Sequence, residues 1–258
     1  MRKRRISDIG PGTAARDGAR SKVVRDALGI GVATGTYGLS FGALATSAGL
    51  SLSQTCALSL LMFTGASQFA FVGVVAAGGA PLAGAATAAL LGTRNALYGL
   101  HLSPLLRVRG VKRLGGAHLV IDESAAMSLN AASRPLSRLG FWTAGLAVFA
   151  CWNLATLLGA LGAHLLSDPA VFGLDVVAPA AFVALMAPRL RSGEAWRAAV
   201  LGAGVALVLL PVTPAGVPVL LAALAVTGLA AWSVRGERRP SGRQAGGHPH
   251  GAAAEEDR

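Results

Sequence analysis

Arg94 is the residue whose type and position most clearly predict chemistry. It follows residues 27–93, which contain no Asp, Glu, Lys, Arg or His, and it lies inside a further hydrophobic segment. An arginine at the centre of a bilayer costs about 2.5 kcal/mol or more, so one that persists there usually faces a cavity or a counter-ion. We expect Arg94 to bind a substrate carboxylate or to pair with a coupling carboxylate. The alternative is that its long side chain reaches the membrane surface near Arg107.

Gly65, Ser67 and Gln68 form a second polar cluster, within the long uncharged stretch. A glycine followed by polar residues predicts a break in a membrane helix, and the free N–H groups at the start of a half-helix attract anions. The Gln68 amide adds donors and an acceptor. We therefore predict that these three residues, with Arg94 and Asn95, bind substrate. Alternatively, Ser67 and Gln68 only join two helices by hydrogen bonds, each contributing about 1 kcal/mol.

Asp122, Glu123 and Asp175 are the predicted coupling residues. Asp122 and Glu123 are adjacent, so on a helix their side chains point about 100° apart and cannot both face one partner. One of them could be the buried carboxylate that a proton-coupled carrier needs. The alternative is a surface pair that neutralises the basic loops on either side. Asp175, one helical turn before Pro179, predicts either a second intramembrane break or the capped start of a span.

The composition places these residues in a membrane protein. The chain has 258 residues, of which 53% are hydrophobic and 14% charged, against about 25% charged in a soluble domain. Its mean hydropathy is +0.56. We predict an all-α, polytopic integral membrane bundle of about seven to eight hydrophobic helical segments, some broken or re-entrant. Residues 1–25 are expected to be a flexible basic cytoplasmic segment, 26–235 the membrane domain, and 236–258 a disordered polar tail.

The order of the segments leaves one conflict. The predicted hydrophobic segments are 27–48, 54–77, 81–102, 139–167, 171–188 and two within 198–234. The positive-inside rule places the basic N-terminus in the cytoplasm and is satisfied by the second half of the chain. In the first half, three crossings would put the basic loop 107–113 outside. Either one segment is re-entrant, or the loop breaks the rule and the short stretch 116–130 crosses. A shared order of long span, turn and broken segment suggests an internal repeat of the two halves.

Several other classes of function fit poorly. The net charge is +11, and a cluster of eight basic residues precedes the first span without stacking aromatics, which argues against nucleic-acid binding. Cys56 and Cys151 are expected to be small buried hydrophobic residues, and the tail histidines His248 and His250 are too few for a metal site. We expect no cofactor, no metal and no catalytic residue.

One enzyme class is kept as an alternative. It is an intramembrane serine protease in which Ser67 is the nucleophile and His164 or His118 the base. Gln68 argues against it, because rhomboid-type sites carry Gly at that place.

Several stretches, taken in order, resemble one family. They are residues 63–69 (FTGASQF), Arg94 with Leu97-Tyr98-Gly99 and Ser103-Pro104, Asp122-Glu123, and Leu174-Asp175 with Pro179-Ala180. Over residues 27–234 the chain resembles the AzlC family of branched-chain amino-acid exporters.

The resemblance implies a function and a partner. It implies export of leucine, isoleucine and valine across the bacterial inner membrane, driven by an ion or proton gradient, together with a small AzlD-type membrane subunit. The chain departs from the family pattern beside the arginine: Asn usually stands two residues before it and His just after it, where this chain has Gly92 and Asn95. Whether copies of this chain associate with one another is left open.

Overall fold

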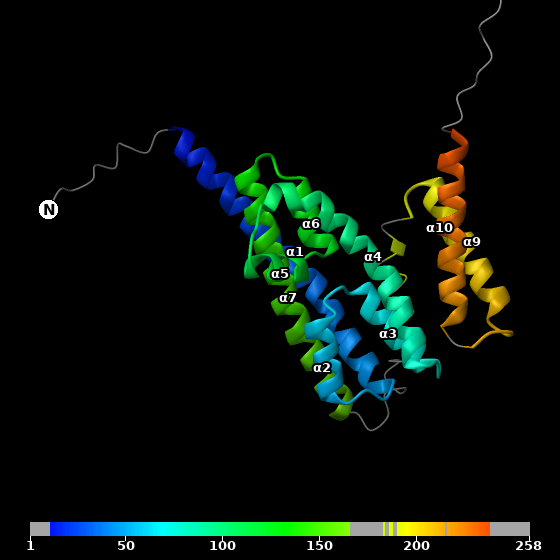
Figure 1. The fold of residues 1–258 in the computed structure, drawn as a ribbon. Helices are drawn as coiled ribbons and strands as arrows, with labels where there is room; N and C mark the ends of the chain where they lie inside the picture. Colours follow the sequence, from blue (N-terminus) through cyan, green and yellow to red (C-terminus); the bar gives the residue numbers. More distant parts are fainter. Residues whose placement is uncertain (1–10, 166–182, 184–185, 188–189, 215, 238–258) are drawn as a thin grey trace, which may run out of the picture.

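The computed structural model describes residues 11–165, 183, 186–187, 190–214 and 216–237, and all regular structure in these residues is helical. The helices are α1 (Pro11–Ser47), α2 (Leu52–Leu61), α3 (Ala66–Ala76), α4 (Pro81–Leu106), α5 (Val111–His118), α6 (Asp122–Leu129), α7 (Arg134–Leu165), α9 (Gly193–Leu209) and α10 (Val217–Glu237) (Figure 1). Among the described residues, Arg16–Ser47 and Arg134–Ala163 are long and apolar enough to cross a bilayer. The predicted all-α membrane fold with broken helices is confirmed.

Helix α1 covers the first predicted span as far as Ser47 and begins well before it. The helix begins at Pro11, so the basic segment predicted to be flexible is helical from that residue onward. A proline suits the first turn of a helix because its missing N–H would have no partner there. At the other end, Gly49 has a φ of 90°, and Leu50 N–H donates to Ala45 O. This left-handed glycine ends α1 one residue before the predicted boundary.

Helices α1 and α7 lie in parallel and touch through glycines. Along α1 the contacts advance from Gly31 to Gly42, while along α7 they advance from Ala147 to Thr156 and Ala160. A Cβ atom at Gly31 would lie 2.7 Å from the Cβ of Ala147, so these backbones are as close as glycine allows. Small residues permit such close packing in membranes, where van der Waals contact and interhelical hydrogen bonds hold helices together.

The second predicted span is a hairpin of two half-helices. Ser51 caps α2, as predicted, and exchanges hydrogen bonds with Gln54 in a capping box. The chain breaks between Leu61 and Ala66, and α3 then returns toward the end where α2 begins, packed mainly against α4. Phe71 and Val75 of α3 accordingly line the same groove as Gln54 and Leu58 of α2. The pair therefore enters and leaves at the same end of the molecule.

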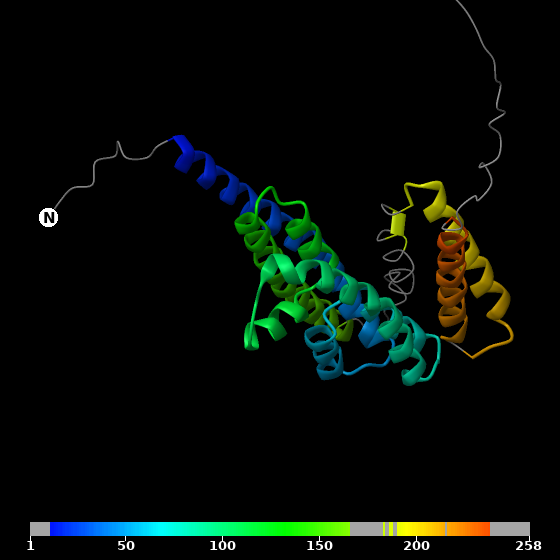
Figure 2. The ribbon, with the colours of Figure 1, turned by 45° about the horizontal axis from the view of Figure 1, so that its top comes forward.

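Helices α5 and α6 form a second such hairpin from the other end. Gly116 of α5 lies beside Trp142, Leu119 beside Gly145, and Met127 of α6 beside Gly140. Helix α5 thus runs inward along α7, and α6 returns toward the start of α7. There Ser128 and Ser137 are joined by a hydrogen bond of 2.8 Å. Helix α4 connects the two hairpins along the sequence and runs beside them (Figure 2).

These two hairpins resolve the conflict in the predicted topology. We call the end that carries the loop 107–113 the basic end. Arg138 of α7 donates to Leu105 O there, and Arg16 and Arg20 of α1 lie beside Pro135. The loop therefore lies at the same end as the starts of α1 and α7, because α2–α3 is re-entrant. The other reading, in which the stretch 116–130 crosses, is wrong, since α5–α6 also turns back.

The two C-terminal spans are confirmed as separate helices, α9 and α10, which form an antiparallel pair (Figure 1). Their connecting turn contains Gly216, which has a φ of 94° and lies against Val74 and Ala83 at the end opposite the basic end. The segment 171–188, apart from residues 183 and 186–187, lies outside the described residues, as do 1–10 and 238–258.

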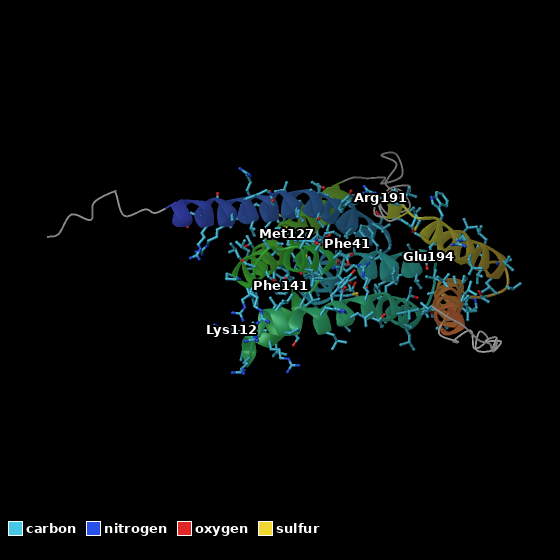
Figure 3. All side chains as sticks on the ribbon, turned by 90° about the horizontal axis from the view of Figure 1, so that it is seen from above. Phe41, Lys112, Met127, Phe141, Arg191 and Glu194 are labelled. Atoms are coloured by element: carbon cyan, nitrogen blue, oxygen red, sulfur yellow. The ribbon has the colours of Figure 1, made fainter. Side chains whose placement is uncertain are left out.

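The core lies where α1, α3 and α7 meet. Phe41, Phe69 and Trp152 are buried and in mutual ring contact, with centroids 5.6 to 6.2 Å apart. Viewed from above, Phe41 and Phe141 lie between α1 and α4, whereas Lys112 lies at the edge of the molecule (Figure 3). Aromatic pairs in this geometry contribute roughly 0.5–1.5 kcal/mol beyond the area they bury.

Candidate functional site

Gln68 holds the break between α2 and α3. Its Oε1 accepts from Gly65 N–H at 3.2 Å, and its Nε2 donates to Leu58 O at 3.2 Å and Ser59 O at 3.4 Å. Gly65 has a φ of 61°, a conformation that glycine adopts without strain. Because Gln68 is fully buried and satisfies carbonyls of one half-helix and an N–H at the start of the other, it fixes where α3 begins. Its predicted role in substrate binding stays a prediction.

The second break is built in the same way. Ser124 is the third residue of α6, as Gln68 is the third of α3. Its Oγ accepts from Ile121 N–H at 3.1 Å and donates to Leu119 O at 2.6 Å. Sequence reasoning missed Ser124, although the third residue of a helix is the position from which a side chain can accept a hydrogen bond from the N-cap N–H. Both half-helices thus begin at a fixed point inside the bundle.

Arg94 and Asp122 form an ion pair between the two breaks. Arg94 lies near the middle of α4, and Asp122 is the first residue of α6. Arg94 Nη1 lies 3.2 Å from Asp122 Oδ2, and the side chains are 30% and 19% exposed. The arginine therefore faces a counter-ion inside the protein rather than extending to the loop at Arg107. The N-terminus of α6 adds a favourable dipole for the carboxylate.

A small cavity contains this ion pair and the start of both half-helices. Its volume is about 60 Å³. It is lined by Thr34, Phe63, Thr64, Gly65, Ala66, Arg94, Ile121, Asp122, Glu123, Val148 and Trp152. Its lining therefore combines polar and charged groups with apolar and aromatic side chains, and the latter come mainly from α7, from the chain just before α3 and from the residue before α6.

Several buried polar atoms at this cavity lack a hydrogen-bond partner among the described residues. They are Thr64 Oγ1, Arg94 Nε and Trp152 Nε1. Buried polar atoms are almost always satisfied, so a group of them at one cavity indicates a place where water or a ligand binds. The trio offers a hydroxyl, which can donate or accept, and two N–H donors, a set that suits an anionic or carbonyl oxygen.

The structure brings most of the predicted site residues together. Gly65, Arg94, Asp122 and Glu123 line the cavity itself. Ser67 is buried behind it, facing α4, where a Cβ atom at Gly92 would lie 3.7 Å from Ser67 Oγ.

Two other predicted residues are not among the described lining of the cavity. Asn95 is half-buried on α4 and follows Arg94, and its Oδ1 has no hydrogen-bond partner among the described residues. Asp175 lies outside the described residues. Sequence reasoning missed Thr34 and Trp152, which lie within apolar runs and carry no distinctive pattern. Thr64 belongs to the motif at 63–69 but was not predicted as a site residue.

The arrangement around Ser67 bears on the protease alternative. Its Oγ makes no hydrogen bond to a histidine or to any other group in the described part of the chain. His118 packs instead against Phe63 and Phe149, and the side chain of His164 is outside the described set. Among the described residues, no group of three His, Cys, Asp or Glu side chains is placed to hold a metal ion.

Comparison with known proteins identifies the family. A sequence model described as "AzlC protein" matches residues 29–166, more than half of the chain. The chain belongs to the AzlC family. The matched region includes both re-entrant hairpins, Arg94 and Asp122, so the candidate site lies within the part that defines AzlC proteins.

A curated relative supports the same assignment. An "Uncharacterized membrane protein" of Archaeoglobus fulgidus is 32% identical over 197 residues, covering 75% of this chain and 85% of the relative. No solved structure is significantly similar to this AzlC protein. The chain is thus a membrane protein, in agreement with the apolar helices α1 and α7.

Proposed function

We propose that this protein is a transporter that exports branched-chain amino acids, namely leucine, isoleucine and valine, across the bacterial inner membrane. The observation that carries the proposal is the Arg94–Asp122 pair, held between two half-helix N-termini in a cavity with one apolar wall. Broken helices that meet near mid-membrane are typical of substrate sites in transporters. Family membership supports the same class of function.

The cavity suits the two charges of an amino acid. The substrate carboxylate would bind Arg94 and the N–H groups at the start of α3, while its ammonium would bind Asp122. An aliphatic side chain would pack against Phe63, Val148 and Trp152, at about 0.8 kcal/mol per buried methylene. The zwitterion would thereby replace each partner of the ion pair with a group of the same charge.

The present cavity is too small for leucine. Its volume of about 60 Å³ is roughly twice the ~30 Å³ that one water molecule occupies in the liquid. Substrate binding therefore requires Arg94 and Asp122 to separate. The ion pair re-forms when the site empties. The empty protein can therefore change back to face the first side of the membrane without an unpaired charge.

Orientation, energy source and partner complete the proposal. The positive-inside rule places the basic end, and with it the N-terminus, in the cytoplasm. Asp122, Glu123 and Asp175 are the candidate carboxylates for proton coupling. A small AzlD-type subunit is proposed to bind this chain, whose exposed apolar surface includes Leu82, Leu97 and Leu100 of α4. No enzymatic activity is proposed.

Counterflow in proteoliposomes tests the proposal. We expect unlabelled leucine inside the vesicles to accelerate uptake of radiolabelled leucine, isoleucine and valine, but not of lysine or aspartate, because the site has one balanced ion pair and an apolar wall. The measurement is made with and without the small subunit, since that subunit is part of the proposed transporter. Equal rates for all amino acids, or no acceleration in either preparation, would contradict the function.

A further inference from the structure

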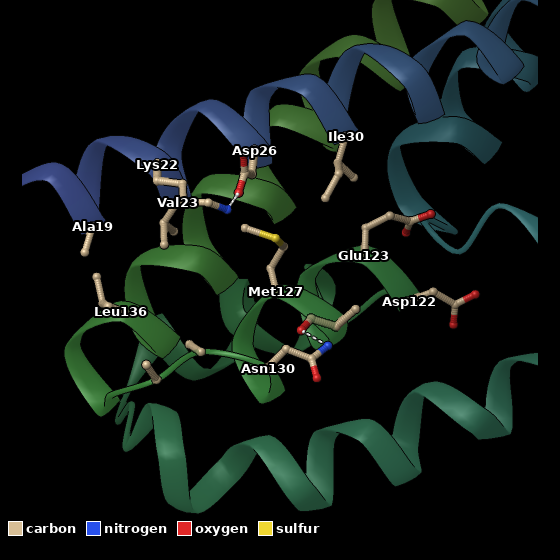
Figure 4. Close-up of a pocket in the computed structure, with 13 residues that line it drawn as sticks. Ala19, Lys22, Val23, Asp26, Ile30, Asp122, Glu123, Met127, Asn130 and Leu136 are labelled. Carbon is tan, nitrogen blue, oxygen red and sulfur yellow. Dashed lines mark hydrogen bonds and ion pairs between the residues drawn. The ribbon is translucent and has the colours of Figure 1, made fainter.

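A large groove runs from the basic end toward the candidate site, between α1 and α6. Its volume is about 750 Å³. Its lining comes from α1, α6, the turn before α7 and the first residues of α7, and includes Val23, Ile30, Ala126, Met127 and Leu136 (Figure 4). These side chains make its walls mainly apolar.

The groove follows one face of each helix down to the ion pair. On α1, the lining residues Ala19, Val23, Asp26 and Ile30 recur every three or four positions, and the next in the series, Thr34, lines the small cavity. Such spacing keeps side chains on a single helical face. The lined face of α1 therefore runs without interruption from the basic end to the candidate site.

Two carboxylates join the groove to the cavity. Asp122 and Glu123 belong to the lining of both, so the groove ends where the small cavity begins. Both side chains extend from the inner end of α6 (Figure 4). Near the outer end, Lys22 and Asp26 form an ion pair of 2.7 Å on the surface of α1. The groove thus has an acidic inner end and apolar walls.

The opposite side of the cavity is closed. Phe41, Phe69 and Trp152 meet there on three different helices and are at most 3% exposed. Phe41 lies about two helical turns beyond Thr34 along α1, and Phe69 lies in the first turn of α3. The aromatic cluster therefore lies between the cavity and the end opposite the basic end.

We propose that the α1–α6 groove is the route by which an aliphatic amino acid reaches the candidate site from the basic end, and that this structure is the state open to that end. This inference rests on the proposed function. The chemistry of the groove fits the ligand: the carboxylate of Glu123 attracts the ammonium group, and the apolar walls accommodate a branched side chain. The substrate then passes from Glu123 to Asp122, where the ion pair opens.

Cysteine accessibility tests the route. In a background of Cys56→Ala and Cys151→Ala, Ala126→Cys places a thiol in the groove. Lys112→Cys is the control at the basic end outside the groove, and Ser53→Cys is the control at the opposite end. A membrane-impermeant methanethiosulfonate is added to inside-out and to right-side-out vesicles, and leucine uptake is measured in the same vesicles.

We expect the cysteine at position 126 to react from the same side as that at 112. Leucine at roughly ten times its Kd should slow the reaction about ten-fold, because only the unoccupied fraction of the protein reacts. The reaction at position 112 should be unaffected by leucine. Modification of position 126 from the side of position 53, or no modification, overturns the route. If leucine is transported but does not slow the reaction at position 126, the route is also overturned. If wild-type vesicles that contain folded protein transport no amino acid, the proposed function is overturned and the route with it.

Discussion

Replacing Arg94 with alanine is expected to reduce transport by at least about 100-fold, which corresponds to roughly 2.7 kcal/mol. The change removes the group proposed to hold the substrate carboxylate. It also leaves Asp122 without the cation 3.2 Å away. Breaking a buried ion pair costs roughly 3–5 kcal/mol, and the partial exposure of these side chains places this case at or below the lower limit. Initial rates of leucine counterflow measure the loss of function.

Two comparisons separate binding from folding. The double variant Arg94→Ala with Asp122→Ala removes both charges, so we expect it to regain thermal stability in detergent but not transport. Arg109→Ala is the matched control, because Arg109 is an exposed arginine in the basic loop, and its transport rate should be that of the wild type. Wild-type counterflow by Arg94→Ala would show that the arginine has no part in the site.

Replacing Gly42 with leucine should prevent α1 from packing on α7. A Cβ atom at Gly42 would overlap Thr156 O and lie 2.8 Å from Ala160 N, and neither backbone can move aside without displacing its helix. Overpacking typically costs about 1–3 kcal/mol and occasionally more, and a backbone contact belongs to the upper part of that range. We expect little folded protein by size-exclusion chromatography after extraction in detergent.

Gly29 provides the matched control on the same helix. No atom lies within 4 Å of a Cβ placed there, outside its immediate chain neighbours. Gly29→Leu should therefore elute and melt like the wild type, or be slightly more stable because leucine favours a helix more than glycine does. If Gly42→Leu behaved in the same way, the close parallel packing of α1 and α7 would be refuted.

Sequence reasoning predicted local features of the fold correctly. The long span at 139–167, the cap at Ser51, the break at Gly65 and the two C-terminal spans all depend on properties of neighbouring residues. A cap or a glycine break involves residues within one helical turn, so neighbouring residues in the sequence are enough to predict it. The start of α1 was the exception, because Gly12 and Gly18 weaken a helical pattern that the structure nevertheless forms.

The direction of the chain after each break could not be predicted. Whether a half-helix continues across the membrane or turns back depends on packing against other helices, mainly α4 for α3 and α7 for α6. The pairing of Arg94 with Asp122 has the same origin, since it joins residues on different helices. The sequence therefore indicated the types of the site residues and not their geometry.

The predicted internal repeat stays a prediction. The hairpins α2–α3 and α5–α6 share a break capped by the third residue of the second half-helix, yet they enter from opposite ends. The repeat was expected instead between the break at Gly65 and the segment of Asp175 and Pro179, which lies outside the described residues.

The central claim is that Arg94 and Asp122 bind the two charged groups of one amino acid. Its most direct test is competition against bound radiolabelled leucine by leucinol, which lacks the carboxylate, and by 4-methylpentanoate, which lacks the ammonium. In the wild type, we expect each analogue to compete roughly 10- to 100-fold less well than leucine, because a hydrogen bond to a charged group contributes about 1.5–3 kcal/mol. In Asp122→Asn, 4-methylpentanoate should compete nearly as well as leucine. An unchanged preference for leucine over 4-methylpentanoate in Asp122→Asn would contradict the account.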